Sequence, residues 1–146
     1  MTLKGPQLSW SILNGFKLIE NRSRSLGLKE GWYGLHTGKG SIEQGNRQKL
    51  ISEITSLPDV ESGLVFGSLV GAFHVLEQRV NTQCGSSIWV DGPVCYVIDA
   101  TIAIDEPIAC PGRLGAWKLD PSIRRKLVSQ LSKAKLRWND MSKVHT

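Results

Sequence analysis

Three charged residues near the start of the chain are spaced so that they can act together. Lys17, Glu20 and Arg22 lie in the stretch GFKLIENR, residues 15–22. If the chain is extended from Leu18 onward, Glu20 and Arg22 point to one face because side chains alternate along a strand, and Lys17 can lean toward them. A lysine with a lowered pKa can act as a base, a carboxylate can position a proton, and a guanidinium can hold a phosphate or an oxyanion. The simpler interpretation is a same-face ion pair beside a solvated lysine, worth at most ~1 kcal/mol when exposed.

The spelling G-x-K-x-x-E-x-R after a short helix resembles the signature of the ASCH domain, a relative of the PUA, YTH and EVE modules. Further segments resemble other blocks of that family in the same order: residues 7–13 (QLSWSIL), 32–40 (WYGLHTGKG), 88–93 (IWVDGP), 96–98 (YVI), 107–108 (PI) and 111–117 (PGRLGAW). The matches cover residues 7–119, although Leu8 stands where proline is usual and Trp10 is shifted by one position.

The resemblance implies a PUA-like barrel with a cleft beside the signature segment, and binding of RNA or nucleosides. Some small bacterial members hydrolyse the amide of acylated cytidines or cleave RNA, and the catalytic lysine of those amidohydrolases corresponds to Lys17. They carry threonine where this chain has Glu20, and their later catalytic acid has no safe counterpart here. We therefore expect a cleft in which Lys17, Glu20 and Arg22 contact single-stranded RNA or a modified nucleoside, with no cofactor and with protein partners left open.

Two alternatives to binding alone remain open at this point. The same cleft could belong to a hydrolase, either an amidohydrolase on N4-acylated cytidine or a ribonuclease, with Lys17 as the general base. The chain could also be a protein-interaction module.

Aromatic residues elsewhere are candidates for stacking on bases. Trp89, Trp32 and Tyr96 have side chains of the kind that hold single-stranded RNA or a flipped base. Trp89 is favoured because Asp91 and the following Gly-Pro pair predict a loop; for Tyr96, stacking and core packing are equally supported. His36 precedes a turn containing Lys39, whose free N–H groups could receive an anion.

Composition and charge narrow the class of protein. At 146 residues, with 40% hydrophobic and 21% charged residues, the chain predicts one globular domain, residues 1–146. The formal net charge is +5 and the basic residues gather toward the C-terminal end. Arg124, Arg125 and Lys133 could contact phosphates there, or could simply solvate a helix face.

Other patterns bear on the compartment and on metals. No apolar run is long enough for a membrane span and the start does not resemble a signal peptide, so we expect a cytoplasmic or nuclear protein that is neither secreted nor bound to a membrane. Cys84, Cys95 and Cys110 lie outside any C-x-x-C pattern, which favours free thiols in a reducing compartment. The histidines are scattered, and no metal site is expected.

The hydrophobic pattern predicts the elements that must position these side chains. We expect helices over residues 7–13, 41–56 and 120–138, the last being basic outside and apolar inside, and strands over residues 18–24, 32–37, 64–80, 94–104 and 114–119. Asn14-Gly15 should end the first helix, and Gly67 and Gly71 suggest a bulge or corner. The pattern leaves an α+β sandwich and a barrel open. With the resemblance, the expected fold is α+β, a small PUA-like partly open β-barrel of about five or six mixed strands flanked by about three helices.

Overall fold

The computed structural model describes residues 1–53, 64–85 and 87–144. Its elements follow one another as β1 (Thr2–Leu3), α1 (Pro6–Leu13), β2 (Ile19–Arg22), β3 (Gly31–Thr37), α2 (Gln44–Glu53), β4 (Ser68–Val80), β5 (Val94–Ala109), α4 (Pro121–Leu131) and β6 (Leu136–Trp138). Short 3₁₀ turns occupy Asn81–Gln83 and Met141–Val144.

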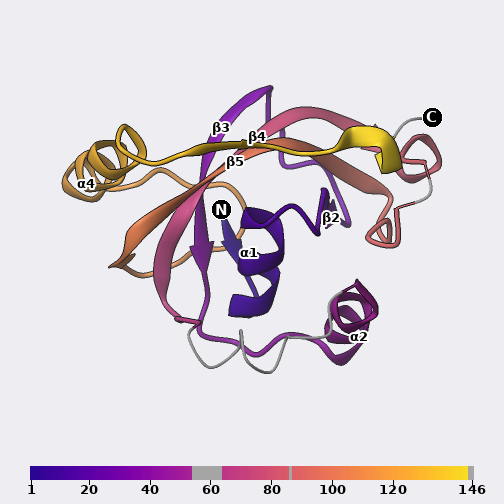
Figure 1. Cartoon of the computed structure of the whole chain (residues 1–146), viewed down its shortest axis with the longest axis horizontal. Helices are drawn as coiled ribbons and strands as arrows, with labels where there is room; N and C mark the ends of the chain where they lie inside the picture. The colour runs from indigo at the N-terminus through magenta and orange to yellow at the C-terminus, as the bar shows by residue number, and fades with distance from the viewer. Residues whose placement is uncertain (54–63, 86, 145–146) are drawn as a thin grey trace.

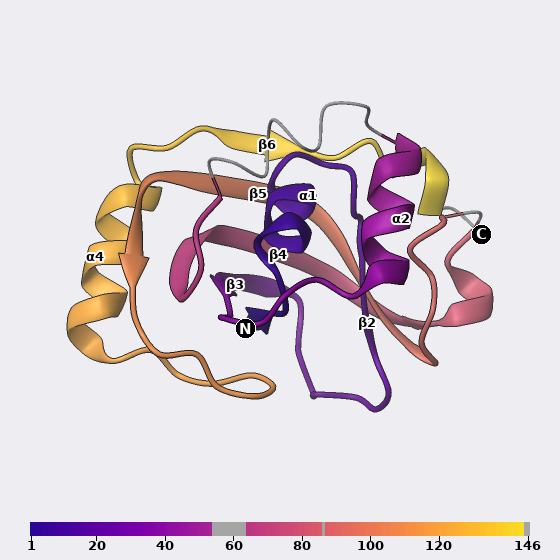
Figure 2. The same cartoon turned by 90° about the horizontal axis from the view of Figure 1, so that it is seen from below.

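The strands form one mixed sheet that does not close. Its order is β1-β3-β4-β5-β2, and β6 pairs with β5 beside β2. Among the strands of the described residues, β1 and β3 pair in parallel and the other pairs are antiparallel. The long strands β4 and β5 curve around α1, which lies within the sheet's concave side (Figures 1 and 2). The expected class, an α+β fold with a partly open barrel and flanking helices, is confirmed.

The inner face of the sheet and α1 share the main core. Ile12 of α1 is fully buried with Phe73 of β4 and Ile98 of β5. The hydroxyl of Thr101 donates to the carbonyl of Leu13 at 3.2 Å, which joins the end of α1 to β5. Burial of this apolar face, at about 25 cal/mol per Å², is the main force that holds the helix in the sheet.

Two glycines predicted to shape the chain do so. Gly15 follows the end of α1 with φ of 77°, a conformation that residues with a Cβ rarely adopt. The pairing of β4 with β5 shifts register between Leu69 and Gly71, so the bulge is confirmed. A Cβ on Gly71 would lie 2.2 Å from the carbonyl oxygen of Ile102, which explains why the side chain must be absent. Gly67 lies before β4, in a turn with φ of 61°.

Two predicted elements are wrong because tertiary contacts decide them. The basic helix predicted over 120–138 ends at Leu131, and Leu136–Trp138 forms β6. Since β2 pairs only with Val94–Val97 of the 16-residue β5, the neighbouring edge at Ala100–Ile102 is free to pair with β6. The strand predicted over 114–119 is a loop, in which Gly115 has φ of 68°, outside the β region.

The remaining differences are in element bounds. The helix predicted from residue 41 begins at Gln44, because Ile42 is held against Gly5 and the core before the helix starts. Residues 54–56 of that prediction lie outside the described residues, and within α2 Leu50 is buried while Ile51 is exposed. β2 ends at Arg22, and β4 begins four residues later than predicted, at Ser68. The apolar stripe of α4 is confirmed, since Ile123, Leu127 and Leu131 pack in a second, smaller cluster.

Candidate functional site

A cleft of about 740 Å³ lies between β2, the turn after β3 and the loop over residues 110–115. Four of the predicted site residues line it: Glu20, Arg22, His36 and Lys39. The other polar and charged side chains of its lining are Thr2, Lys4, Asn21, Glu43 and Arg113. Residues far apart in the chain therefore meet here, and the four cations of the lining outnumber its two carboxylates.

The predicted convergence of Lys17, Glu20 and Arg22 is observed. Lys17 Nζ donates to Glu20 Oε1 at 3.0 Å, and Arg22 Nη2 donates to Glu20 Oε2 at 2.9 Å. Lys17 and Glu20 are only 2% and 6% exposed, so the interpretation of Lys17 as a solvated residue is wrong. A buried carboxylate shared by two cations is a fixed acceptor, whose orientation is set before any ligand arrives.

The two cations differ in their access to the cleft. Lys17 does not line the cleft; its ammonium group also donates to the carbonyl of Ile19, behind Glu20. Arg22 does line it, and its Nε is buried with no hydrogen-bond partner among the described residues. An unpaired buried donor costs about 1–3 kcal/mol, so a shift of the guanidinium that let this N–H reach an acceptor in the cleft would be favourable.

Trp89, the favoured stacking residue, is part of the core. It is 2% exposed, and Lys17 Nζ lies 5.5 Å from the centroid of its ring, within the range of a cation–π contact. Tyr96 is also fully buried, with its hydroxyl accepting the N–H of Leu26 at 2.8 Å. Neither ring lines the cleft: Trp89 is not on the exposed loop expected for it, and of the two alternatives left open for Tyr96 the structure has core packing.

Asn21 holds the loop that buries Trp89, a role that was not predicted from the sequence. Its side-chain oxygen accepts the N–H groups of Asp91 at 2.9 Å and Gly92 at 3.2 Å, and its amide donates to the carbonyl of Trp89. This folds the loop after Trp89 back onto β2. An asparagine between two charged residues of a strand was the available signal, because its amide can satisfy backbone groups that no strand pairs.

His36 is held in a network at the wall of the cleft. Its Nε2 lies 2.7 Å from the carbonyl of Cys110, so this nitrogen carries the proton and donates. Its Nδ1 then accepts from the hydroxyl of Thr2 at 3.3 Å, and Thr2 in turn accepts from the indole N–H of Trp117. Burial lowers the pKa of His36, which favours the neutral ring.

This burial predicts a pH dependence of stability. Because the folded pKa of His36 is below its ordinary value of 6.5, the unfolded state binds the proton more readily. The stabilisation is complete above that value and is lost as pH falls through the folded pKa, by at most about 1.4 kcal/mol per pH unit for one proton. Urea unfolding at about pH 7.5 and about pH 5.5 should show a smaller loss of stability in His36→Gln than in the unmodified protein. Equal losses would contradict this assignment.

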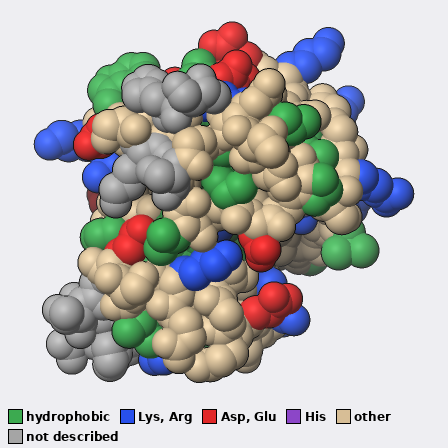
Figure 3. All heavy atoms as spheres, turned by 90° about the vertical axis from the view of Figure 1, so that its right-hand side faces the viewer, with side chains coloured by type: hydrophobic (Ala, Val, Ile, Leu, Met, Phe, Trp, Pro, Cys, Tyr) green, Lys and Arg blue, Asp and Glu red, His purple; other side chains and the backbone are tan. Residues whose placement is uncertain are grey.

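The other predicted binding residues lie outside the cleft. Arg124 and Arg125 are exposed on α4, and Lys133 is exposed in the turn after it. Figures 1 and 2 place α4 at one end of the molecule and β2 toward the other. On the side that carries α2, basic and acidic side chains are interspersed (Figure 3). Trp32 is exposed on β3, away from the cleft lining.

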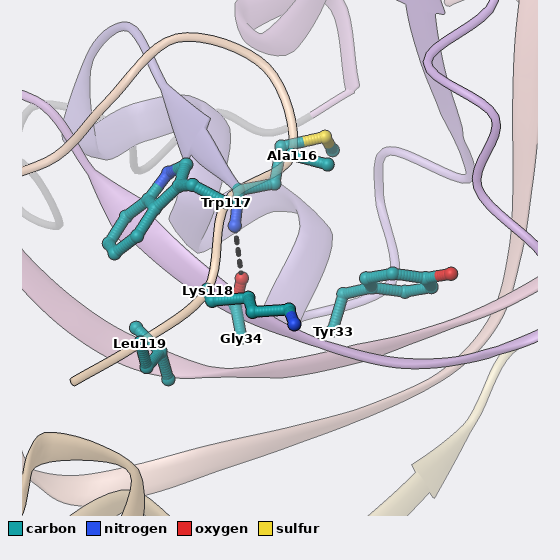
Figure 4. A pocket seen from close by; sticks show the side chains of 7 residues that line it. Tyr33, Gly34, Ala116, Trp117, Lys118 and Leu119 are labelled. Carbon is teal, nitrogen blue, oxygen red and sulfur yellow. Dashed lines mark hydrogen bonds between the residues drawn. The ribbon is translucent and has the colours of Figure 1, made fainter. Parts of the chain in front are cut away.

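A smaller pocket of about 350 Å³ lies against β3 (Figure 4). Tyr33, Trp117 and Leu119 contribute to its wall, and the amine of Met1 donates to the carbonyl of Gly34 at 2.8 Å, drawn as the dashed line. Burial, followed by the charge of Arg22, lowers the pKa of this amine to about 6. No predicted site residue lines this pocket.

Within the described residues, no group of three or more His, Cys, Asp or Glu side chains could hold a metal ion. All three cysteines are free, and burial, with Cys84 adding to it, raises the pKa of Cys95 to about 12. No helix in that part of the chain is both long and apolar enough to span a membrane. Comparison of the chain with protein-family models and with curated proteins found no match.

Proposed function

We propose that the cleft binds a nucleoside, either modified and free or as part of single-stranded RNA. The observation that carries the proposal is Arg22, whose guanidinium lines the cleft with one N–H unpaired and is anchored by Glu20. Arginine presents planar donors that suit phosphate and base acceptors. The resemblance of residues 15–22 to the ASCH signature supports the same class of ligand.

Glu20 adds a group that phosphate binding alone does not need. Each of its oxygens accepts one hydrogen bond, from Lys17 and from Arg22, while an ionised carboxylate has about four acceptor positions. A carboxylate that still accepts can recognise an exocyclic amino group, as acidic residues do with N4 of cytosine. We expect Glu20 to select for an amino-bearing base, with Arg22, Lys39 and Arg113 contacting acceptors and phosphates.

Removal of the cleft's exposed cations tests this proposal. Arg113→Ala and Lys39→Ala each remove an exposed basic side chain from the lining, and Lys29→Ala removes an exposed one outside it. Each cleft variant should bind a labelled single-stranded RNA of about 12 nucleotides more weakly, and the slope of log K against log salt should flatten by about 0.7 per lost phosphate contact. Fluorescence anisotropy over a salt series measures both. Cleft variants that behave like Lys29→Ala would refute the proposal.

The same preparations decide whether binding leads to turnover. The hydrolase hypothesis needs Lys17 to take a proton from substrate, yet its ammonium lies behind Glu20. We therefore expect N4-acetylcytidine and RNA to remain intact when their products are followed by chromatography. Release of cytidine or RNA fragments would replace a binding function with a hydrolytic one.

A further inference from the structure

A row of side chains crosses the outer face of the sheet, and none of them lines the cleft. Trp32 of β3 pairs with His74 of β4, His74 with Ala100 of β5, and Ala100 with Trp138 of β6. Directly paired residues point to the same face of a sheet. We call Trp32, His74 and Trp138 the aromatic row.

The opposite face of these strands holds the core, which leaves the aromatic row on the outside. The neighbouring residues Tyr33 and Phe73 point inward and their rings lie 6.1 Å apart, while Thr101 bonds to α1. Trp32 is 46% exposed and Trp138 68%. α4 packs farther along this face, where its Leu127 lies over Gly34 and clusters with Leu69, Ile104 and Ile108.

The middle of the aromatic row is fixed in place. Asp99, at a register shift beside Ala100, lies 2.6 Å from Nδ1 of His74. The ring of His74 lies 5.3 Å from that of Trp32 at an interplanar angle of 58°. One tryptophan is thus buttressed by a hydrogen-bonded histidine, so its ring loses little conformational freedom when something stacks on it.

We propose that the aromatic row is a second binding site, at which bases of a single-stranded nucleic acid stack on Trp32 and Trp138. The row spans three strand spacings of about 4.8 Å, roughly 14 Å, so the two indoles, with His74 between them, are far enough apart to stack on separate bases of one strand. Exposed aromatic rings on adjacent strands of a sheet hold two or three bases in this way without strict sequence preference.

The charge near the row favours a nucleic acid as its occupant. The segment over residues 121–144, which includes Trp138, has seven basic residues and one acidic residue, Asp140. On α4, Arg125 and Lys126 line a groove together with Glu106. Because an α-helix has 3.6 residues per turn, Arg124 and Val128 lie on the other side of α4. Exposed Lys133 and Lys135 lie in the turn that leads to β6. The carboxylate of Asp99, which contacts the row, is engaged by His74.

Substitutions of Trp138 test the proposal. Trp138→Ala should weaken binding of single-stranded RNA and of single-stranded DNA of about 12 nucleotides by about fivefold or more, since stacking is the interaction lost. Trp138→Tyr should retain binding because it keeps a flat π face, whereas Trp138→Leu should lose it. Phe66→Ala is the matched control, because Phe66 is an exposed aromatic residue outside the row. Circular dichroism melting confirms that each variant is folded.

Three results would overturn the inference. Unchanged affinity in Trp138→Ala and Trp32→Ala would show that no base stacks on the row. Retained affinity in Trp138→Leu would mean that any apolar side chain suffices. Concentration-dependent self-association in sedimentation, abolished by Trp138→Ala with nucleic-acid binding unchanged, would assign the face to a second copy of the chain.

The two sites are separated by repeating the measurement in Arg113→Ala. An effect of Trp138→Ala in that background supports the aromatic row whether or not the cleft binds RNA. An effect of Arg113→Ala alone leaves the cleft proposal standing and overturns this one.

Discussion

Replacement of Glu20 by alanine is expected to lower the free energy of unfolding by about 3–5 kcal/mol. Lys17 is buried, and among the described residues its acidic partner is Glu20, at 3.0 Å. Without the carboxylate, the ammonium keeps the carbonyl of Ile19 and the face of Trp89, but its charge has no counterion. Removal of one member of a buried pair is costly because the charge that remains is not solvated. Urea unfolding followed by circular dichroism measures the loss.

Two further variants serve as comparisons, one at the same position and one at an exposed ion pair. Glu20→Gln keeps the volume and an acceptor for Lys17, so the loss should be smaller than for alanine. Glu77→Ala breaks an ion pair with Arg79 whose carboxylate side chain is 48% exposed, and should cost no more than about 1 kcal/mol. If Glu20→Ala were as stable as Glu77→Ala, Lys17 would not be held as a buried ion.

The second large effect is expected at Trp89. Trp89→Ala should lower the free energy of unfolding by about 3–5 kcal/mol, the usual cost of truncating a buried tryptophan. The change opens a cavity beneath Lys17 and removes the cation–π contact. The ring of Trp89 does not line the cleft. RNA affinity of the folded variant should therefore change only indirectly, through the loss of packing behind Lys17 and Glu20.

Trp138→Ala is the matched control for this experiment. It removes the same side chain from a site that is 68% exposed, so its stability should change by within about 0.5 kcal/mol. The two tryptophans thus have opposite expected profiles: loss of Trp89 affects folding, and loss of Trp138 affects binding. A Trp89→Ala variant with unchanged stability and lost RNA affinity would restore the stacking role first predicted for it.

Together, these results would show how the cleft is assembled. Trp89 and Lys17 support Glu20 from behind, Glu20 orients Arg22, and only the last two face the ligand space. Asn21 holds the loop that keeps Trp89 in place. A change in any supporting residue is therefore expected to affect both stability and binding, whereas Arg113 and Lys39 should affect binding alone.

The sequence by itself determined the features that depend on neighbours along the chain. Asn14-Gly15 ends α1, Gly71 marks the bulge, and the spacing of Lys17, Glu20 and Arg22 brings their charges together. Backbone conformation at a glycine and alternation along a strand are local properties, so residue types are sufficient to predict them. The local patterns alone left an α+β sandwich and a barrel open, and the strand pairing decides between them.

Only the tertiary structure decided which aromatic rings are buried and which edges are paired. Trp89 and Tyr96 are in the core because Asn21 and Leu26, about 70 positions away, bind their loop and hydroxyl. Trp138 is on an exposed strand because β2 leaves part of β5 unpaired. Burial and strand pairing are set by surfaces that meet only when distant segments pack, since the free energy comes from area removed from water and from shared hydrogen bonds. No local pattern contains that information.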